Sequence, residues 1–296
     1  MRRPWQFGKP KTPGFGLNKA YYLTVLSSKP VLPPMLTIIN PKGAGGAVEG
    51  FGAPLSENAD KESLGKPLER GAYAIASKDQ KTVLRLLVMS KEEAGYDPEP
   101  FLRSPMAKEM DEELLVRIRS TWVIGQLTFE SHDPMVYPAI DFQLDFASRL
   151  AELTEGVVSD PISRRYLLPE HVKQPLRADP RIDAREVIGL SHRAKETGIH
   201  LFTLGMQKFG LREFEITGVE IGDLVLAESL VMSLCQSALL GMIPANGDRI
   251  GPKGHEFEIR EGGFDRALWE GIEVFELIPP TTRTPGECLH AWKAAL

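Results

Sequence analysis

Two glutamates separated by one residue, Glu213 and Glu215, have a type and spacing that could support chemistry. They alternate with Phe214 and Ile216, and the two-residue period of a strand places both carboxylates on one face. Paired carboxylates can serve as acid and base or grip a cation. We favour a simpler interpretation, in which they form the wet face of a half-buried antiparallel strand, because that alternation is typical of such sheets.

A second candidate acid/base pair, His132 and Asp133, stands in the first half of the chain. The two residues follow the strand-like run 120–129, so their polar groups would emerge at a strand end, where sites are often built. They also precede Pro134, and an Asp before Pro is typical of a simple turn. An enzyme would need this pair to meet the two glutamates in one pocket.

Two basic residues are further candidates for binding a ligand. Lys208 lies in a loop bracketed by Gly205 and Gly210, and Arg249 follows Asp248 in a predicted turn. A turn that faces solvent is enough to explain a charged residue at Arg249. Both residues are therefore candidate ligand-binding residues, and the sequence indicates no specific ligand for either.

Motifs that specify a reaction or a cofactor are absent from the sequence. It contains no P-loop, no nucleophile elbow, no dinucleotide fingerprint and no spacing of metal ligands around Cys235 or Cys288. The glycines between positions 43 and 52 do not make a phosphate loop, because the chain continues into Pro54 and not into a helix that begins with Ser or Thr. We expect neither a metal nor a cofactor.

Composition places the chain among ordinary globular proteins. Its 296 residues are 42% hydrophobic and 25% charged, and the 27 glycines and 23 prolines imply many turns. The net charge of −5 is too small to direct the protein to nucleic acid or to an anionic membrane. No apolar leader and no run of eighteen apolar residues is visible, so we expect a cytoplasmic protein.

The hydrophobic pattern predicts an α+β fold, with a mixed, mostly antiparallel sheet packed against two main helices. The main helices are expected at 139–154 and 222–241, and the second is apolar nearly all round, which predicts burial on most sides. A further helix is expected over 104–117. Strands are expected at 20–26, 35–39, 72–77, 82–89, 120–129, 157–159, 165–168, 200–204, 213–216, 255–260 and 274–278.

The chain divides into an arm, one domain and a tail. The second lobe of the domain shows few strands, so we expect the strand at 200–204 to join the sheet of the first lobe. The predicted parts are an irregular Pro/Gly-rich arm at 1–19, a single α+β domain at 20–278 with two lobes at about 20–168 and 185–278, and a linker with a short helix at 279–296.

Both ends of the chain offer surfaces for a partner. The arm carries Trp5, Phe7 and Phe15, which either bind a partner or, in the interpretation that we favour, pin the arm to its own domain. The terminal helix places Leu289, Trp292 and Leu296 on one face, which predicts docking on its own body or on a neighbouring subunit. We therefore expect a protein partner or a homo-oligomer through the arm or this helix.

Several short motifs resemble a known family. Thr203-Leu204-Gly205-Met206 is followed by Phe209-Gly210-x-x-Glu-x-Glu, a helix and a Gly-Asp turn. This pattern, together with the strand at 122–129 and the helix at 139–154, resembles the bacterial family catalogued as domain of unknown function 4261. The resemblance covers roughly residues 20 to 279. It implies one mixed α/β unit of intracellular bacterial origin, and it implies no catalytic residue, since the family has no agreed activity.

Two function classes fit these observations. The preferred one is a non-enzymatic binding or accessory protein of the bacterial cytoplasm that acts through protein–protein contacts. The alternative is a hydrolase or metal-assisted enzyme that uses His132, Asp133, Glu213 and Glu215.

Overall fold

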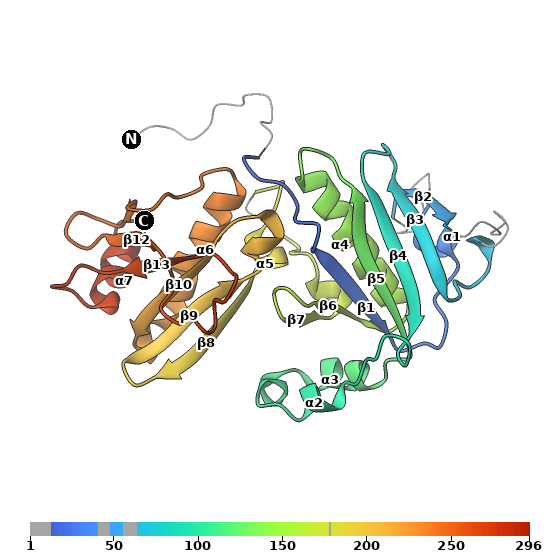
Figure 1. The fold of residues 1–296 in the computed structure, drawn as a ribbon, viewed down its shortest axis with the longest axis horizontal. Helices are drawn as coiled ribbons and strands as arrows, with labels where there is room; N and C mark the ends of the chain where they lie inside the picture. Colours follow the sequence, from blue (N-terminus) through green and yellow to red (C-terminus); the bar gives the residue numbers. More distant parts are fainter. Residues whose placement is uncertain (1–12, 41–47, 56–63, 178) are drawn as a thin grey trace.

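The computed structural model describes residues 13–40, 48–55, 64–177 and 179–296. Two lobes lie side by side, each built on its own sheet and each with one long helix (Figure 1). Helix and strand each account for 29% of the chain, and both sheets are mostly antiparallel, so the predicted α+β fold class is confirmed. Most of the N-terminal arm, including Trp5 and Phe7, and most of the glycine-rich loop lie outside the described residues.

The first lobe contains a seven-stranded antiparallel sheet in the order β2-β3-β4-β5-β1-β6-β7. On its fourth strand Leu84 and Leu86 are buried, whereas Arg85 between them is exposed, as the two-residue period requires. The sheet consists of β1 (Tyr22–Ser27), β2 (Gly50–Pro54), β3 (Gly71–Ser77), β4 (Val83–Ser90), β5 (Val123–Ser131), β6 (Val157–Asp160) and β7 (Arg165–Leu167).

One long helix, α4 (Tyr137–Leu153), covers one face of this sheet. Ile140, Leu144, Ala147 and Ala151 are buried at the spacing predicted for its apolar face. They pack in the same core as inward-facing residues of β1, β4 and β5. The predicted amphipathic helix of the first lobe is therefore present, and its apolar face forms one side of the hydrophobic core.

The opposite face of the sheet is covered along one edge only. A segment that projects from the lower edge of the lobe in Figure 1 buries Leu114 and Ile118 against β1 and β5. The single helix predicted over 104–117 is wrong, because the chain turns at Met110 and begins a new helix with Asp111 accepting from the backbone NH of Glu113 at 2.8 Å. The segment comprises α2 (Glu99–Leu102), η3 (Met106–Glu109) and α3 (Glu112–Arg119).

The strand predicted at 35–39 is also wrong, because this segment forms α1 (Met35–Ile38). Met35 and Ile38 are buried three residues apart, whereas Leu36 between them is exposed. This is the spacing of a helical turn, and the preceding Pro34 occupies its N-cap position. A short apolar run of five residues is compatible with a strand or with a helical turn, and here the turn that begins after Pro34 produces the helix.

The second lobe has its own six-stranded sheet, in the order β11-β12-β13-β10-β9-β8. The expectation that 200–204 joins the first sheet is therefore wrong. The segment 200–204 pairs instead with a polar strand at 189–195, which the hydrophobic pattern did not reveal. The pair β10 and β13 is parallel and the others are antiparallel. The strands are β8 (Gly189–Lys195), β9 (Gly198–Leu204), β10 (Glu213–Val219), β11 (Arg249–Ile250), β12 (Phe257–Glu261) and β13 (Val274–Ile278).

Helix α6 (Leu224–Leu239) packs on one face of the second sheet. Leu230 and Val231 are fully buried, but Val225 is 71% exposed, so the prediction of burial on most sides is wrong. Among the described residues, Ile221–Leu239 is the one stretch that is long and apolar enough to cross a membrane by length and composition, and 28% of it is buried. A helix over the core of a soluble protein satisfies the same test, so this stretch is weak support for a membrane span.

The C-terminal helix α7 (Pro285–Ala294) packs on α6 and β10. The Thr284 hydroxyl accepts a hydrogen bond from the backbone NH of Glu287 at 3.2 Å, and the Glu287 carboxylate accepts one from the backbone NH of Thr284 at 2.8 Å, which completes a capping box. Leu289 is fully buried and Leu296 is 81% exposed. This helix therefore docks on its own chain through the first part of the predicted stripe.

One hydrophobic core runs through both lobes. The Tyr137 hydroxyl of α4 donates to the backbone oxygen of Leu239 in α6 at 2.5 Å. Beside it, Arg177 bridges Asp141 of α4 and the buried Glu186 at 2.5 and 2.6 Å. The connection between the lobes contains two short helical turns, η4 (Pro169–His171) and α5 (Ala184–Val187). Two further turns belong to the second lobe: η5 (Met206–Phe209) lies between β9 and β10, and η6 (Ile221–Asp223) directly precedes α6.

Candidate functional site

Glu213 is fully buried at the start of β10 and binds the loop that precedes its own strand. Its carboxylate accepts hydrogen bonds from Thr203 Oγ1 at 2.7 Å and from the backbone NH groups of Gly205 at 2.7 Å and Gln207 at 3.2 Å. Burial raises the pKa of this carboxyl, and the hydrogen bonds offset that effect only in part. The side chain holds the turn that contains η5 against the sheet.

Glu215, two residues later, is also fully buried but has different partners. Its Oε2 atom lies 2.8 Å from His200 Nε2 and accepts from Trp269 Nε1 at 2.5 Å. Its other oxygen accepts from the backbone NH of Phe264. Glu215 therefore fastens residues 262–273, the connection between β12 and β13, across the sheet.

The prediction that these two glutamates form the wet face of a strand is wrong. They do share a face of β10, as the strand period requires, but the loop at 262–273 covers that face. Phe214 and Ile216 on the other face are buried in the core that includes α6. Alternating polar and apolar residues here mark a strand that is buried on both sides, with each carboxylate saturated by fixed donors.

His132 and Asp133 directly follow the end of β5 in the first sheet. Asp133 Oδ1 accepts from the backbone NH of Met135 at 2.8 Å, and its Oδ2 lies 3.5 Å from Lys81 Nζ. His132 Nδ1 is 3.1 Å from the backbone oxygen of Asp133. These contacts are those of a turn tied to β4, which is the simpler of the two interpretations.

The four acid/base candidates have no common site. His132 and Asp133 belong to the first lobe, whereas Glu213 and Glu215 lie under a loop on the second sheet, and no contact in the described ranges joins the two pairs. Within those same ranges, no group of three or more His, Cys, Asp and Glu side chains is arranged to hold a metal ion. In the described part of the chain, these four side chains do not converge in one site, as the predicted carboxylate/His enzyme would require.

Lys208 makes a buried polar contact between the lobes. Its ammonium, fully buried in η5, donates to Asp160 Oδ2 at the end of β6 and to the backbone oxygen of Val187. Burial lowers the pKa of Lys208 to about 8, although the neighbouring Asp160 carboxylate acts in the opposite direction. The nitrogen also lies 5.1 Å from the ring centroid of Tyr21. This candidate is a joint between the sheets and does not reach solvent.

Arg249, the other basic candidate, belongs to the two-residue edge strand β11. Its side chain is exposed and stands opposite Glu258 in the strand register. It lines neither of the two concave regions of the first lobe.

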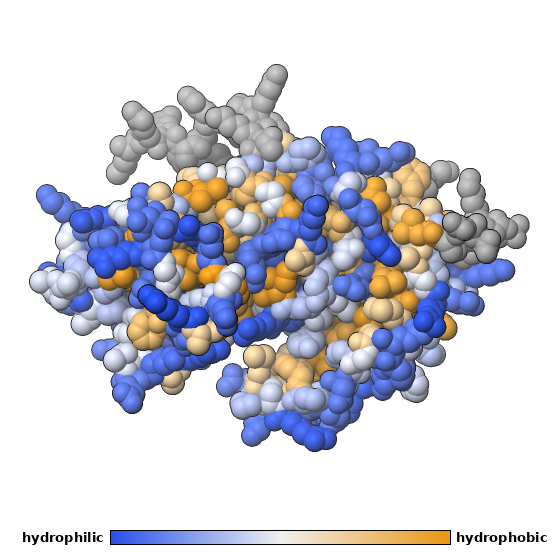
Figure 2. Space-filling view, viewed as in Figure 1, coloured by the Kyte–Doolittle hydropathy of each residue, from blue (hydrophilic) through white to orange (hydrophobic). Residues whose placement is uncertain are grey.

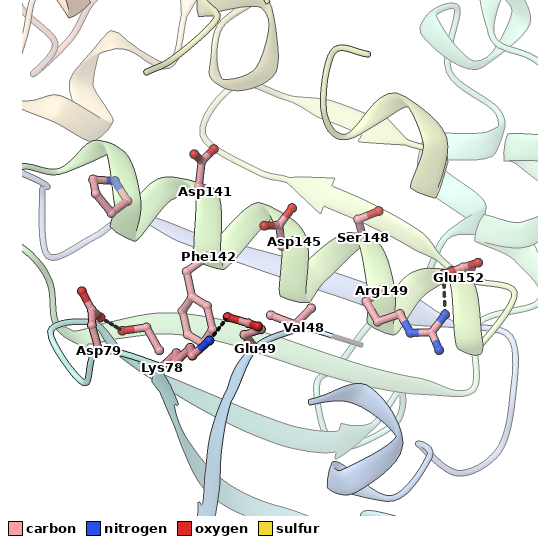
Figure 3. A pocket seen from close by; sticks show the side chains of 12 residues that line it. Val48, Glu49, Lys78, Asp79, Asp141, Phe142, Asp145, Ser148, Arg149 and Glu152 are labelled. Carbon is pink, nitrogen blue, oxygen red and sulfur yellow. Dashed lines mark hydrogen bonds and ion pairs between the residues drawn. The ribbon is translucent and has the colours of Figure 1, made fainter. Parts of the chain in front are cut away.

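A groove of about 910 Å³ runs between α4 and the β2–β3 edge of the first sheet. Its charged side chains pair with one another or with neighbours: Lys78 with Glu49 at 2.9 Å and Arg149 with Glu152 at 2.8 Å (Figure 3). Asp145 is likewise bound by Lys173 at 2.7 Å. Each of these charged groups has an opposite charge beside it, so the groove offers a ligand no uncompensated charge among the described residues.

A cleft of about 730 Å³ lies on the other face of the same sheet. Its floor is one cross-strand row, because Gln126 of β5 stands opposite Thr24 of β1, Thr24 opposite Ser159 of β6, and Ser159 opposite Tyr166 of β7. Side chains in register point to the same face of a sheet. The floor is therefore polar and crosses four adjacent strands.

An apolar wall borders one side of this floor. Phe101 of α2 and Met106 of η3 form its outer part, and Phe101 packs on Tyr166 with ring centroids 4.7 Å apart. Met89 and Tyr96 complete it. In Figure 2 the segment that carries this wall projects at the lower edge of the molecule, and an indentation separates it from the second lobe.

The opposite rim of the cleft carries polar groups, contributed by Tyr22 and by the turn between β6 and β7. Arg164 of this turn is exposed, with a backbone φ of 52°. Within the described part of the chain, the side chains of Arg164, Tyr22, Thr24 and Gln126 have no hydrogen bond or ion pair. These unpaired groups distinguish the cleft from the groove, and they make it the candidate functional site.

The residues of the cleft were not among the sequence-based candidates. Arg164 and Arg165 are adjacent in the sequence, and two neighbours in a strand face opposite ways, so the pair does not by itself predict a clamp. Alternation of Tyr22 and Thr24 with Leu23 and Val25 was a usable signal for a second, polar face on β1. The wall could not be inferred, because its helix segment is far away in sequence.

Comparison of the chain with protein-family models, with curated proteins and with solved structures gave no match. The likeness to the family named above therefore stays an expectation from the sequence.

Proposed function

We propose that this protein is a non-enzymatic binding protein that recognises a segment of a partner polypeptide in the cleft on the first sheet. The observation that carries the proposal is the gathering of unpaired polar side chains, Gln126, Thr24, Tyr22 and Arg164, around an apolar wall in one concave site. Groups that the chain itself leaves unsatisfied are available to a ligand at little desolvation cost compared with buried, paired ones.

The residue types of the cleft also favour a protein partner. Protein interfaces are enriched in Tyr, Phe, Met and Arg and depleted in Lys, and the most energetic contacts come from aromatic and Arg side chains. The cleft has this composition, and no Lys is among the described residues that line it. Its aromatic and methionine residues are Tyr22, Tyr96, Tyr166, Phe101, Met89 and Met106.

The cleft replaces the partner surfaces expected from the sequence. The C-terminal helix uses Leu289 within its own chain, which leaves less of its apolar face for a second subunit. The intracellular location and the protein partner remain part of the proposal. The enzyme alternative is not carried further, because Glu213 and Glu215 serve as acceptors for fixed donors of the fold.

Selection of a random dodecapeptide library on the immobilised full chain tests this function. We expect a selected peptide to bind the wild-type protein in a fluorescence anisotropy titration. Binding to the Met106→Glu variant, which places a charge on the apolar wall, should be much weaker. Met106 is 50% exposed, so the substitution leaves the fold intact.

Met242→Glu is the matched control, because Met242 is 64% exposed and does not line the cleft. Binding that survives Met106→Glu, or that is lost equally in both variants, would show that the partner does not use the cleft. Failure to select any peptide would also count against the proposal.

A further inference from the structure

Arg164 leaves an uncompensated positive charge on the rim of the cleft. The other charged residues that line it are engaged: Glu93 with Arg70 at 2.6 Å, and Asp160 with Lys208. Arg165 donates to the backbone oxygens of residues 185 and 186, each at 2.7 Å. A binding partner therefore meets one free guanidinium, to which a negative charge is complementary.

The turn that presents Arg164 is held in place from behind. Asp160 Oδ1 accepts from the backbone NH of Ser163 at 3.2 Å, and Arg165 ties the following residue of the turn to the second lobe. Asp160 itself is fixed by Lys208. Two anchored neighbours thus define where the backbone of Arg164 lies, while its side chain stays free for a ligand.

Building on the proposed function, we infer that the partner segment is an extended peptide that carries an acidic residue directly beside an apolar one. The wall with Phe101 and Met106 and the rim with Arg164 stand on opposite sides of the polar floor. Successive side chains of an extended chain point to opposite sides. One residue then meets the wall and its neighbour meets the arginine.

The floor sets the length of the segment. From Gln126 on β5 to Tyr166 on β7 there are three gaps between neighbouring strands. At about 4.8 Å for each gap, the floor is about 14 Å wide, which is about four residues of extended chain. Thr24 and Gln126 can hydrogen-bond the peptide backbone along it, because both are unpaired in the described chain.

Fluorescein-labelled hexapeptide pools test this inference on the full chain by anisotropy. One pool has Leu-Asp fixed at the centre, the second Leu-Lys, and the third Leu-Ala-Asp, with Ala, Gly, Ser and Thr mixed at the other positions. We expect Leu-Asp to bind about fivefold more tightly than Leu-Lys, as an exposed ion pair allows, with the difference reduced at high salt. Leu-Ala-Asp, which places both side chains on one side, should bind no better than Leu-Lys.

Arg164→Gln should abolish the preference for Asp, whereas Arg249→Gln, an exposed arginine outside the cleft, should retain it. Equal binding of the Asp and Lys pools, with both lost in Met106→Glu, would overturn this inference and leave the cleft as the binding site. Binding that ignores Met106→Glu, or no binding of any pool, would overturn the proposed function as well.

Discussion

The ammonium of Lys208 in the second lobe donates to the carboxylate of Asp160 in the first, and both side chains are buried. Asp160 ends β6, whose following turn forms the rim of the cleft, so the contact between the lobes lies directly behind the candidate site. Burial by itself would raise the pKa of Asp160, but Lys208 and Arg165 lower it overall, so the carboxyl is ionised at neutral pH.

Asp160→Asn should lower the free energy of unfolding by about 3–5 kcal/mol, because it leaves the buried ammonium of Lys208 without a counter-charge. The double variant Asp160→Asn/Lys208→Met should regain most of that loss, since it removes the ammonium that Asp160→Asn leaves buried without a partner. Urea unfolding of the full chain measures both. Additive effects of the two substitutions would mean that they are not coupled.

Alkaline pH should stabilise the wild type relative to Lys208→Met. The unfolded chain keeps the lysine proton up to its ordinary pKa of 10.5, whereas the folded chain releases it near pH 8. Between these values the unfolded state binds more protons, so the free energy of unfolding rises with pH, by up to about 3 kcal/mol. Unfolding curves of both proteins at pH 7, 8.5 and 10 check the sign, and a difference that shrinks with pH would contradict it.

Glu215→Gln should loosen the loop at 262–273. The amide oxygen can replace only part of an acceptor set that now serves His200, Trp269 and the backbone of Phe264, and we expect a loss of about 2–4 kcal/mol. Amide hydrogen exchange should increase locally in that loop, and the fluorescence of Trp269 should shift. Glu261→Gln at the exposed end of β12 is the control, and unchanged exchange in Glu215→Gln would contradict the role assigned to this carboxylate.

Leu289→Ala and Leu296→Ala compare the docked face of α7 with the exposed residue that follows the helix. The first removes a fully buried side chain and should cost about 2–5 kcal/mol, whereas the second changes a residue that is 81% exposed and should stay within about 0.5 kcal/mol. Thermal and urea unfolding measure both. Equal effects would show that the helix does not dock as described.

The sequence alone determined the elements with strong local patterns. The apolar positions of 139–154 recur at helical spacing, and Phe214 and Ile216 alternate with polar neighbours, so these segments form the predicted helix and strand. The short run at 35–39 lacked such a pattern, since five apolar residues fit a strand or a helical turn equally well. The α+β class followed from the longer patterns.

Tertiary structure decided which of these elements meet, and with them the site. Glu213 and Glu215 share a strand face as their spacing requires, but only the loop at 262–273 makes that face an interior. The cleft brings together Thr24, Gln126 and Phe101. These residues are far apart along the chain, so no periodic pattern in the sequence predicts that they meet. A local hydrophobic pattern indicates which side of a helix or strand is apolar. Which other element packs against that side depends on contacts between residues that are distant in the sequence.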